Sequence, residues 1–187
     1  MKIPSLDNLH IVYYPDGILK RVCEPVESFG PELQNLADRM LALMHTGEGL
    51  GLAAPQVGVA IRLFVCNLTG EPEDDAVYVN PKLSDLQGAT EEPEGCLSIP
   101  EVDVTMRRST GATIEAVDAA GNPIRRESQD LTARVWQHEM DHLDGRLITD
   151  NMSSTDEIAN RRALKQLEAD FAESPRRRSS SRCESSS

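Results

Sequence analysis

Two of the four histidines in this 187-residue chain, His138 and His142, are four residues apart, and Glu139 directly follows the first of them. Residues four apart lie on the same face of an α-helix, so both imidazoles could bind one divalent metal ion. Glu139 would then lie about 100° around the helix, beside the metal rather than on it. A carboxylate in that position can take up and return a proton during metal-assisted hydrolysis. A polar helix surface could show the same pattern by chance, but ligand spacing between two of only four histidines favours a metal site.

The third ligand of such a site must come from another part of the chain, because a catalytic metal usually has three protein ligands and one open position. No histidine follows His142, so a downstream ligand would have to be a carboxylate. Upstream, Cys96 lies between a glycine and a leucine, and its thiolate would be a soft donor suited to Fe(II), Zn or Co(II). The downstream candidates are Asp144, Asp150, Glu157 and Glu168.

These residues predict an order of events for the hydrolysis of an amide. A bound metal lowers the pKa of its water from ~15.7 towards ~7, which provides hydroxide at neutral pH. The metal-bound hydroxide would attack the carbonyl carbon, with Glu139 as the general base and then as the acid that protonates the leaving amine. The developing oxyanion needs hydrogen-bond donors, and the side-chain amide of Gln56 and the backbone N–H of Leu97 could serve.

Gln56 lies in an apolar, glycine-rich segment, residues 49–58, that allows two interpretations. Glycine permits close backbone approach, so the segment could be a wall against which the backbone of a ligand lies. Alternatively, it is a tight loop under the core, with Gln56 bonded to a backbone group. The segment lacks the lysine and the Ser/Thr of a phosphate-binding loop, which argues against nucleotide binding.

Three helices are predicted from apolar periodicity and end signals. The first begins at Pro31 and continues for about 14 residues. The second, residues 131–143, carries the metal motif, with Asp130 as its N-cap and Gly145 beyond its end. Residues 154–157 form a capping box that opens a last amphipathic helix.

Strands are predicted where β-branched and aromatic residues alternate with polar ones. Pro81 is expected to end one of them, since proline cannot donate to a ladder. Residues 82–92 are only weakly patterned. The predicted strands are 61–68, 77–81, one near Met106, 112–118 and a return strand from residue 124.

Composition limits the class of protein. Charged residues make up 27% and hydrophobic residues 39% of the chain, which is typical of a globular protein, and no apolar run is long enough to span a bilayer. The net charge of −12 argues against binding of specific DNA. No signal or transit peptide is visible, which favours the cytoplasm. We expect one catalytic domain over residues 1–174 and a disordered, low-complexity Arg/Ser tail over residues 175–187.

Three motifs together resemble those of the peptide deformylases, and they occur in that family's order. The similarity covers roughly residues 10–150 and is far more specific than the histidine pair alone. The motifs are Gly51-Leu52-Ala53-Ala54-Pro55-Gln56, Glu94-Gly95-Cys96-Leu97-Ser98 and Gln137-His138-Glu139-Met140-Asp141-His142.

The resemblance implies an enzyme of the bacterial cytoplasm that removes the N-formyl group from the formyl-methionine of nascent polypeptides and releases formate. It implies one divalent metal, Fe(II) in the cell, which Zn, Ni or Co can replace in preparations. The implied fold is α+β, with antiparallel sheets around a central helix that carries the histidine pair, and with an N-terminal and a C-terminal helix.

The resemblance also assigns roles to residues of this sequence. The metal ligands would be Cys96, His138 and His142, and Glu139 would be the acid and base. Gln56 and the Leu97 N–H would donate hydrogen bonds to the oxyanion. The backbone of Leu50, Gly51 and Gly95 would pair with an extended peptide. A methionine pocket would be lined by Leu131, Val135 and the alkyl stem of Arg134.

Two stretches depart from the family pattern. Residues 101–104 differ where the family makes outer substrate contacts, and the sequence from Asn151 onwards does not match closely. In some members a C-terminal helix contacts the ribosome; the last helix or the basic tail could do so here, although a docked surface helix with a solvated tail is an equal alternative.

Two other functions remain as alternatives: an endopeptidase with a downstream third ligand, and a catalytically silent peptide-binding or metal-storing homologue. The retention of Glu139 argues against the silent homologue.

Overall fold

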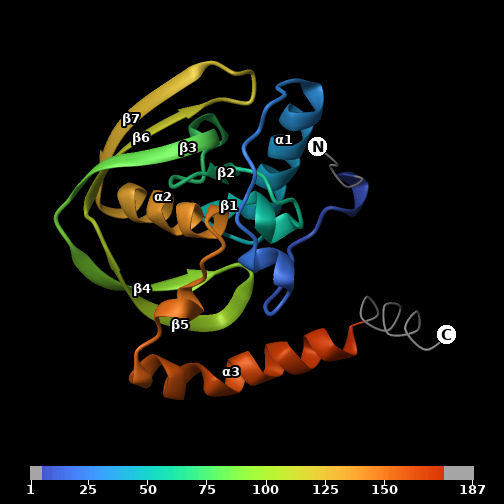
Figure 1. Cartoon of the computed structure of the whole chain (residues 1–187), viewed down its shortest axis with the longest axis vertical. Helices are drawn as coiled ribbons and strands as arrows, with labels where there is room; N and C mark the ends of the chain where they lie inside the picture. The colour runs from blue at the N-terminus through green and yellow to red at the C-terminus, as the bar shows by residue number, and fades with distance from the viewer. Residues whose placement is uncertain (1–5, 175–187) are drawn as a thin grey trace.

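The helix that carries the histidine pair, α2 (Asp130–Leu143), lies between two antiparallel sheets (Figure 1). The computed structural model describes residues 6–174, so the predicted tail over residues 175–187 lies outside the described part of the chain. The smaller sheet pairs β4 (Thr90–Cys96) with β5 (Ile99–Arg108). The larger sheet has the order β1 (Gly51–Ala53), β2 (Leu63–Cys66), β3 (Ala76–Gln87), β6 (Gly111–Val117) and β7 (Pro123–Gln129).

Two further helices cover this framework, and the predicted α+β class with a helix near each end is confirmed. Helix α1 (Pro31–Thr46) packs on β1 and β2, whereas α3 (Ser154–Glu173) packs on β5. Short 3₁₀ turns occupy Leu6–Asn8, Gly17–Lys20, Ala54–Val57, Pro72–Asp74 and Ile148–Asn151.

The helix starts differ slightly from those predicted. Helix α1 begins at Pro31 as expected. Asp130 is not the N-cap of α2: Gln129 is, and Asp130 is the first helical residue, with a φ of 54°. The capping box of α3 is shifted by one residue, because Ser153 and Asp156 bond reciprocally. These shifts leave the faces of the helices unchanged.

The prediction that Pro81 ends a strand is wrong. Strand β3 continues to Gln87, with an irregularity in its pairing to β6 between Val79 and Lys82. Asn80 has a φ of 51° there, and its side chain bonds both backbone groups of Val26. The bulge takes Pro81 out of the regular ladder, so its missing N–H breaks no regular pair.

The smaller sheet was largely missed by sequence reasoning, which saw a strand only near Met106. In β5 the side chains of Val102, Val104, Met106 and Arg108 are buried in alternation with exposed ones. The atypical residues 101–104 lie inside β5, next to an irregularity in its pairing with β4, where Glu101 has a φ of 61°.

Three apolar clusters hold the layers together. One joins α1 to β1 and β2, and another joins α2 to the opposite side of the larger sheet through Phe64, Tyr78 and Trp136. Their ring centroids are 5.0 Å (Phe64–Tyr78) and 5.9 Å (Tyr78–Trp136) apart. The third cluster packs β5 against α3. These contacts fix α2 between the two sheets.

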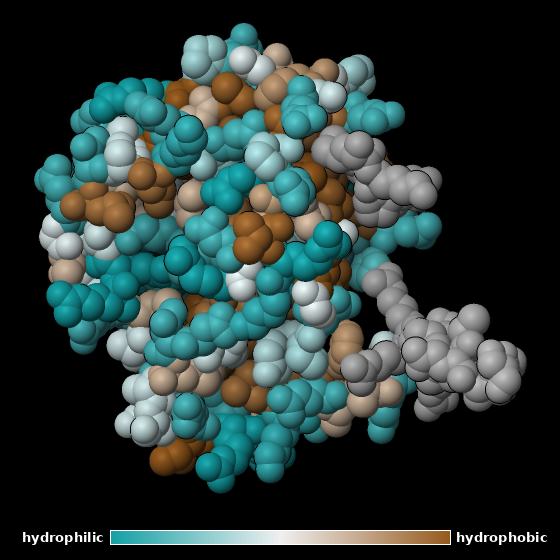
Figure 2. All heavy atoms as spheres, viewed as in Figure 1, coloured by the Kyte–Doolittle hydropathy of each residue, from teal (hydrophilic) through white to brown (hydrophobic). Residues whose placement is uncertain are grey.

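The surface is mostly hydrophilic in the view of Figure 2, with isolated hydrophobic residues. Among residues 6–174, no helix combines the length and apolarity that crossing a membrane would require.

The end of α2 depends on Gly145, and this yields a first prediction. Gly145 has a φ of 71°, and a Cβ there would lie 2.5 Å from the carbonyl oxygen of Lys20. We expect Gly145→Ala to lower the free energy of unfolding by about 2–3 kcal/mol, measured by urea denaturation. Gly17→Ala is the control, since a Cβ at Gly17 meets nothing within 4 Å. Equal losses in the two variants would contradict the role of Gly145.

Candidate active site

The structure brings Cys96, His138 and His142 into one cluster. One ligand atom of each lies within 4.8 Å of the others, and Cys96 Sγ is 3.3 Å from His142 Nε2. Cys96 ends β4, whereas the two histidines come from successive turns of α2. Burial, together with the charges of His138 and Arg108, lowers the pKa of His142 well below its usual value and keeps this imidazole neutral. Burial also disfavours a charged His138, but hydrogen bonds with Cys96 and Glu94 raise its pKa well above the usual value, so a bound metal would displace a proton from that ring. A thiolate and two imidazoles therefore fit a divalent metal with an open position.

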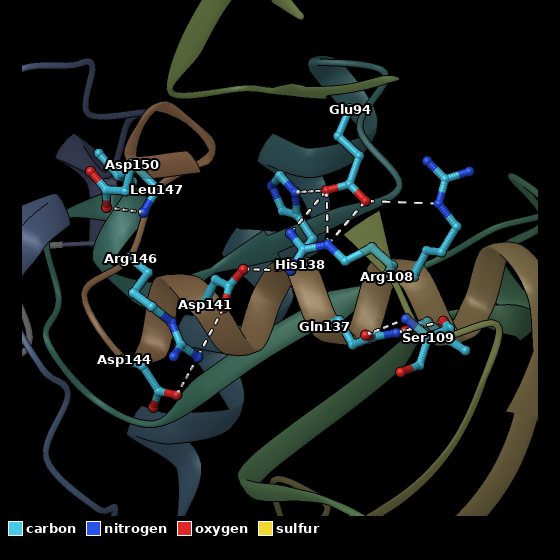
Figure 3. A network of polar contacts seen from close by, with 12 residues as sticks. Glu94, Arg108, Ser109, Gln137, His138, Asp141, Asp144, Arg146, Leu147 and Asp150 are labelled. Atoms are coloured by element: carbon cyan, nitrogen blue, oxygen red, sulfur yellow. Dashed lines mark hydrogen bonds and ion pairs between the residues drawn. The ribbon is translucent and has the colours of Figure 1, made fainter. Parts of the chain in front are cut away.

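The downstream carboxylates that sequence reasoning considered as third ligands have other partners. Asp144 pairs with Arg62 and Arg146, and Asp150 pairs with Lys20 and caps the backbone of Leu147 (Figure 3). On α3, Glu168 accepts a hydrogen bond from Tyr14, and Glu157 is exposed; none of the four belongs to the cluster.

Glu139 lies beside the cluster with one carboxylate oxygen free. The residue is 3% exposed, and Oε2 has no hydrogen-bond partner among the described residues. Burial raises the pKa of Glu139 to about 7 against the opposing charge of His138. A group with this pKa both accepts and donates protons near neutrality. Gly51 packs directly on this carboxylate: a Cβ there would overlap Oε1 and lie 2.8 Å from Cδ.

Gln56 is buried and held in one orientation. Its Oε1 accepts a hydrogen bond from the Ala53 N–H at 2.8 Å, so its Nε2 is directed toward Cys96 Sγ, 3.4 Å away. The structure confirms the bond of Gln56 to a backbone group, which belonged to the second interpretation of the glycine-rich segment; a wall for the backbone of a ligand stays a prediction. The same amide also presents its NH₂ to Cys96. Leu97 follows Cys96 in the tight turn between β4 and β5.

A buried ionic network surrounds the cluster, and sequence reasoning missed it (Figure 3). Arg108 donates to both oxygens of Glu94 and, at 2.5 Å, to Asp141 Oδ2. Glu94 Oε2 is also 3.1 Å from His138 Nδ1, which leaves Nε2 of that ring for the cluster. Burial would raise the pKa of Glu94, but hydrogen bonds from His138 and Arg108 outweigh it and hold the pKa at about 2. The sequence signal that could have indicated this network is Arg108, a charged residue at a position where the alternating pattern of β5 places buried side chains.

A cavity of about 700 Å³, which we name the catalytic groove, opens over these residues. Leu50 and Leu131 lie at its rim, 40% and 45% exposed, and Val135 is buried. The Arg134 guanidinium is turned aside to the carbonyl of Pro93. All predicted site residues except the more deeply buried His142 line the groove: Leu50, Gly51, Gln56, Gly95, Cys96, Leu97, Leu131, Arg134, Val135, His138 and Glu139.

Comparisons with known proteins agree with this geometry. The polypeptide deformylase family model matches residues 8–157. A peptide deformylase of Hydrogenovibrio crunogenus is 36% identical over 168 residues, which cover 90% of this chain and 98% of the relative. The crystal structure of a Legionella pneumophila peptide deformylase has a TM-score of 0.82 at 37% identity, covering 89% of this chain and 99% of that one. A plant peptide deformylase has a TM-score of 0.86 at 36% identity, covering 92% and 95%.

The buried network yields a second prediction. Arg108→Met would remove the buried guanidinium that joins Glu94 to Asp141, leaving Glu94 with Arg134 at 3.7 Å and Asp141 with the half-exposed Arg146. We expect the free energy of unfolding to fall by about 3 kcal/mol. Urea unfolding followed through Trp136 fluorescence measures this loss. Arg125→Met is the matched control: Arg125 is 56% exposed and its carboxylate partners are exposed as well, so the change should stay within about 0.5 kcal/mol. A loss for Arg108→Met no larger than that of the control would refute the role assigned to the network.

Proposed function

The chain belongs to the polypeptide deformylase family, and from this premise we propose how its own residues remove the N-formyl group from nascent polypeptides. As a member of this family it is a metal-dependent amide hydrolase. The observation that carries the proposal is the convergence of Cys96, His138 and His142 with Glu139 and Gln56 on one groove.

We propose that Cys96, His138 and His142 bind the metal ion. A divalent ion bound there would supply Lewis-acid activation of water and of the formyl oxygen. Fe(II) is our choice for the ion in the cell, because one thiolate and two imidazoles form a mixed donor set of the kind it accepts. Zn, Ni or Co would replace it in preparations. The bond between His138 Nδ1 and Glu94 supports this assignment, since it orients the ring.

Glu139 handles the proton in this proposal. Its free Oε2 takes a proton from the water that adds to the formyl carbon. The amide NH₂ of Gln56 and the backbone N–H of Leu97 donate to the oxygen that becomes negative. Glu139 then returns the proton to the amine nitrogen as the C–N bond breaks, and formate leaves.

The groove suits an extended peptide because its two walls are sheet edges. Strand β1 is the edge strand of the larger sheet, and β4 has a partner only on its β5 side. The Leu50 carbonyl accepts from the Asn67 N–H inside the sheet, and we propose that the Leu50 N–H donates to the peptide. The backbone groups of Gly51 point to the free edge, because these directions alternate along a strand. We propose that a formylated peptide adds between Gly51 and Gly95 as an extra strand.

The methionine side chain is assigned to the end of the groove formed by Leu131, Val135 and the stem of Arg134. All three line the groove, and the Arg134 guanidinium is occupied by the Pro93 carbonyl at 3.3 Å and by Glu94 Oε1 at 3.7 Å. An apolar surface of this kind suits an unbranched thioether.

Ribosome contact remains a proposal for α3, whose Arg161, Arg162 and Lys165 are exposed. The arginine run at 176–178 that could add to it lies outside the described residues. A substrate that emerges from the ribosome also supports our proposal of a bacterial cytoplasmic location.

The proposed chemistry is tested by Glu139→Gln. We expect this variant to retain its metal and to lose about 10³-fold or more in kcat, because the amide cannot carry the proton. The assay is formate release from formyl-Met-Ala-Ser by the Fe(II)-loaded protein under anaerobic conditions, with the metal content measured in parallel. Cys96→Ser should instead lower the metal content. Wild-type formate release by Glu139→Gln would falsify the role of Glu139, and cleavage of internal peptide bonds without formate would favour an endopeptidase.

The contact between Gly51 and Glu139 provides a further test. Gly51→Ala must displace the Glu139 carboxylate, so we expect kcat to fall about 10- to 100-fold with little loss of stability. Gly111→Ala is the control, because a Cβ there makes only ordinary contacts of 3.7–3.9 Å. If Gly51→Ala keeps the kcat of the control, the placement of the carboxylate does not limit the reaction.

A further inference from the structure

A second cavity of about 440 Å³ lies between residues 10–16 and the C-terminal end of α3, at the side of the molecule where that helix ends (Figure 1). We name it the side cleft. Its wall is mainly apolar and aromatic, and no residue of the proposed metal site contributes to it. The lining residues used below are Ile11, Tyr13, Pro100, Leu167, Asp170 and Phe171.

The side cleft adjoins the catalytic groove, because Tyr13 and Pro100 line both cavities. Tyr13, at this junction, is 50% exposed. The backbone around Tyr13 is anchored to the segments that carry the proposed oxyanion donors: the Val12 N–H donates to the Gln56 carbonyl at 2.7 Å, and the Tyr14 N–H donates to the Ser98 carbonyl at 2.9 Å. The junction of the two cavities at Tyr13 is therefore fixed in position by the backbone of the active-site segments.

We propose that the side cleft binds the part of the nascent polypeptide that follows its first few residues, with a preference for apolar side chains. This inference rests on the proposed function, because it needs the formyl-methionine in the catalytic groove. Leu131 and Val135 are assigned to the methionine side chain, and the peptide beyond it can leave the groove where Tyr13 and Pro100 also line the side cleft. Three extended residues span only about 10 Å, whereas a nascent chain continues far beyond them.

The charges near the cleft support a peptide rather than ribosomal RNA as the occupant. Asp16 and Asp170 line the cleft, and Glu168 bonds the hydroxyl of Tyr14 beside it. Carboxylates in these positions would repel a phosphate backbone. Ile11, Leu167 and Phe171 instead offer apolar surface, whose burial by leucine or phenylalanine side chains is favourable.

The kinetic test uses formylated peptides of three, five, seven and nine residues that all begin formyl-Met-Ala-Ser. One series continues with serines and the other with leucine and phenylalanine. With the full-length, Fe(II)-loaded protein we expect the KM of the apolar series to fall about tenfold relative to the serine series once the peptide is long enough, with kcat unchanged. In Phe171→Ala the ratio of the two KM values should approach one. Ile158→Ala, on the same helix but 71% exposed and outside the cleft, should keep the wild-type ratio.

A binding measurement gives a second readout that does not depend on turnover. Fluorescence anisotropy of the labelled nine-residue apolar peptide, acetylated in place of formylated, should show a Kd about tenfold lower than that of the serine peptide. The difference should disappear in Phe171→Ala and persist in Ile158→Ala.

The outcomes separate this inference from the proposed function. Absence of formate from the tripeptide would refute the proposed function itself. Normal tripeptide turnover with equal KM and Kd for the apolar and serine series at every length would overturn the side cleft alone. Tighter binding of the long peptide after deletion of residues 175–187 would identify the chain's own tail as the occupant. A dimer that dissociates in Phe171→Ala would identify a second copy, and either result would also overturn the proposal.

Discussion

The buried ionic network of Glu94, Arg108 and Asp141 is the interaction on which the rest of the site depends. Each of its members comes from a different element, β4, β5 and α2, so it joins the smaller sheet to the central helix. A buried charge without a partner is costly, whereas a complete set satisfies every member. The network therefore tolerates one arrangement of the three elements. In that arrangement Glu94 also binds His138, and Cys96 at the end of β4 is brought to His142.

Small residues give the reacting groups their close approach. The Glu139 carboxylate occupies the space that a Cβ at Gly51 would need. Leu97 packs against Gly49 in the same way, since a Cβ at Gly49 would lie 2.6 Å from Leu97 Cδ1. A side chain at Gly51 would push β1 away from Glu139 on α2, and one at Gly49 would displace Leu97. The glycines thus serve packing and chemistry together: they allow a carboxylate to be buried beside the proposed metal ligands and keep a strand edge open to a peptide backbone.

The two cavities divide recognition between backbone and side chains. In the catalytic groove the edges of β1 and β4 can bind any extended backbone, which suits an enzyme that acts on many nascent chains. In our proposal, selectivity for the first residue depends on the apolar surface of the groove at Val135, and the side cleft adds a weaker preference further along the peptide. Tyr13 lies where the two cavities meet, on a segment bonded to the backbone of Gln56 and Ser98.

The local chemistry could be predicted from residue types and helix periodicity alone. The spacing of His138 and His142 predicted their common face, and the three motifs predicted the class of enzyme and its fold. Which distant groups meet depends instead on the packing of separate elements. Gln56 and Cys96 are 40 residues apart in the chain and Cys96 and His142 are 46 apart, so their contacts depend on strand register and on the path of the chain between them. The same reason explains why the sequence did not predict the partners of Arg108, the free edge of β1 or the side cleft. These features arise where separate elements pack, and no residue spacing within one segment indicates them.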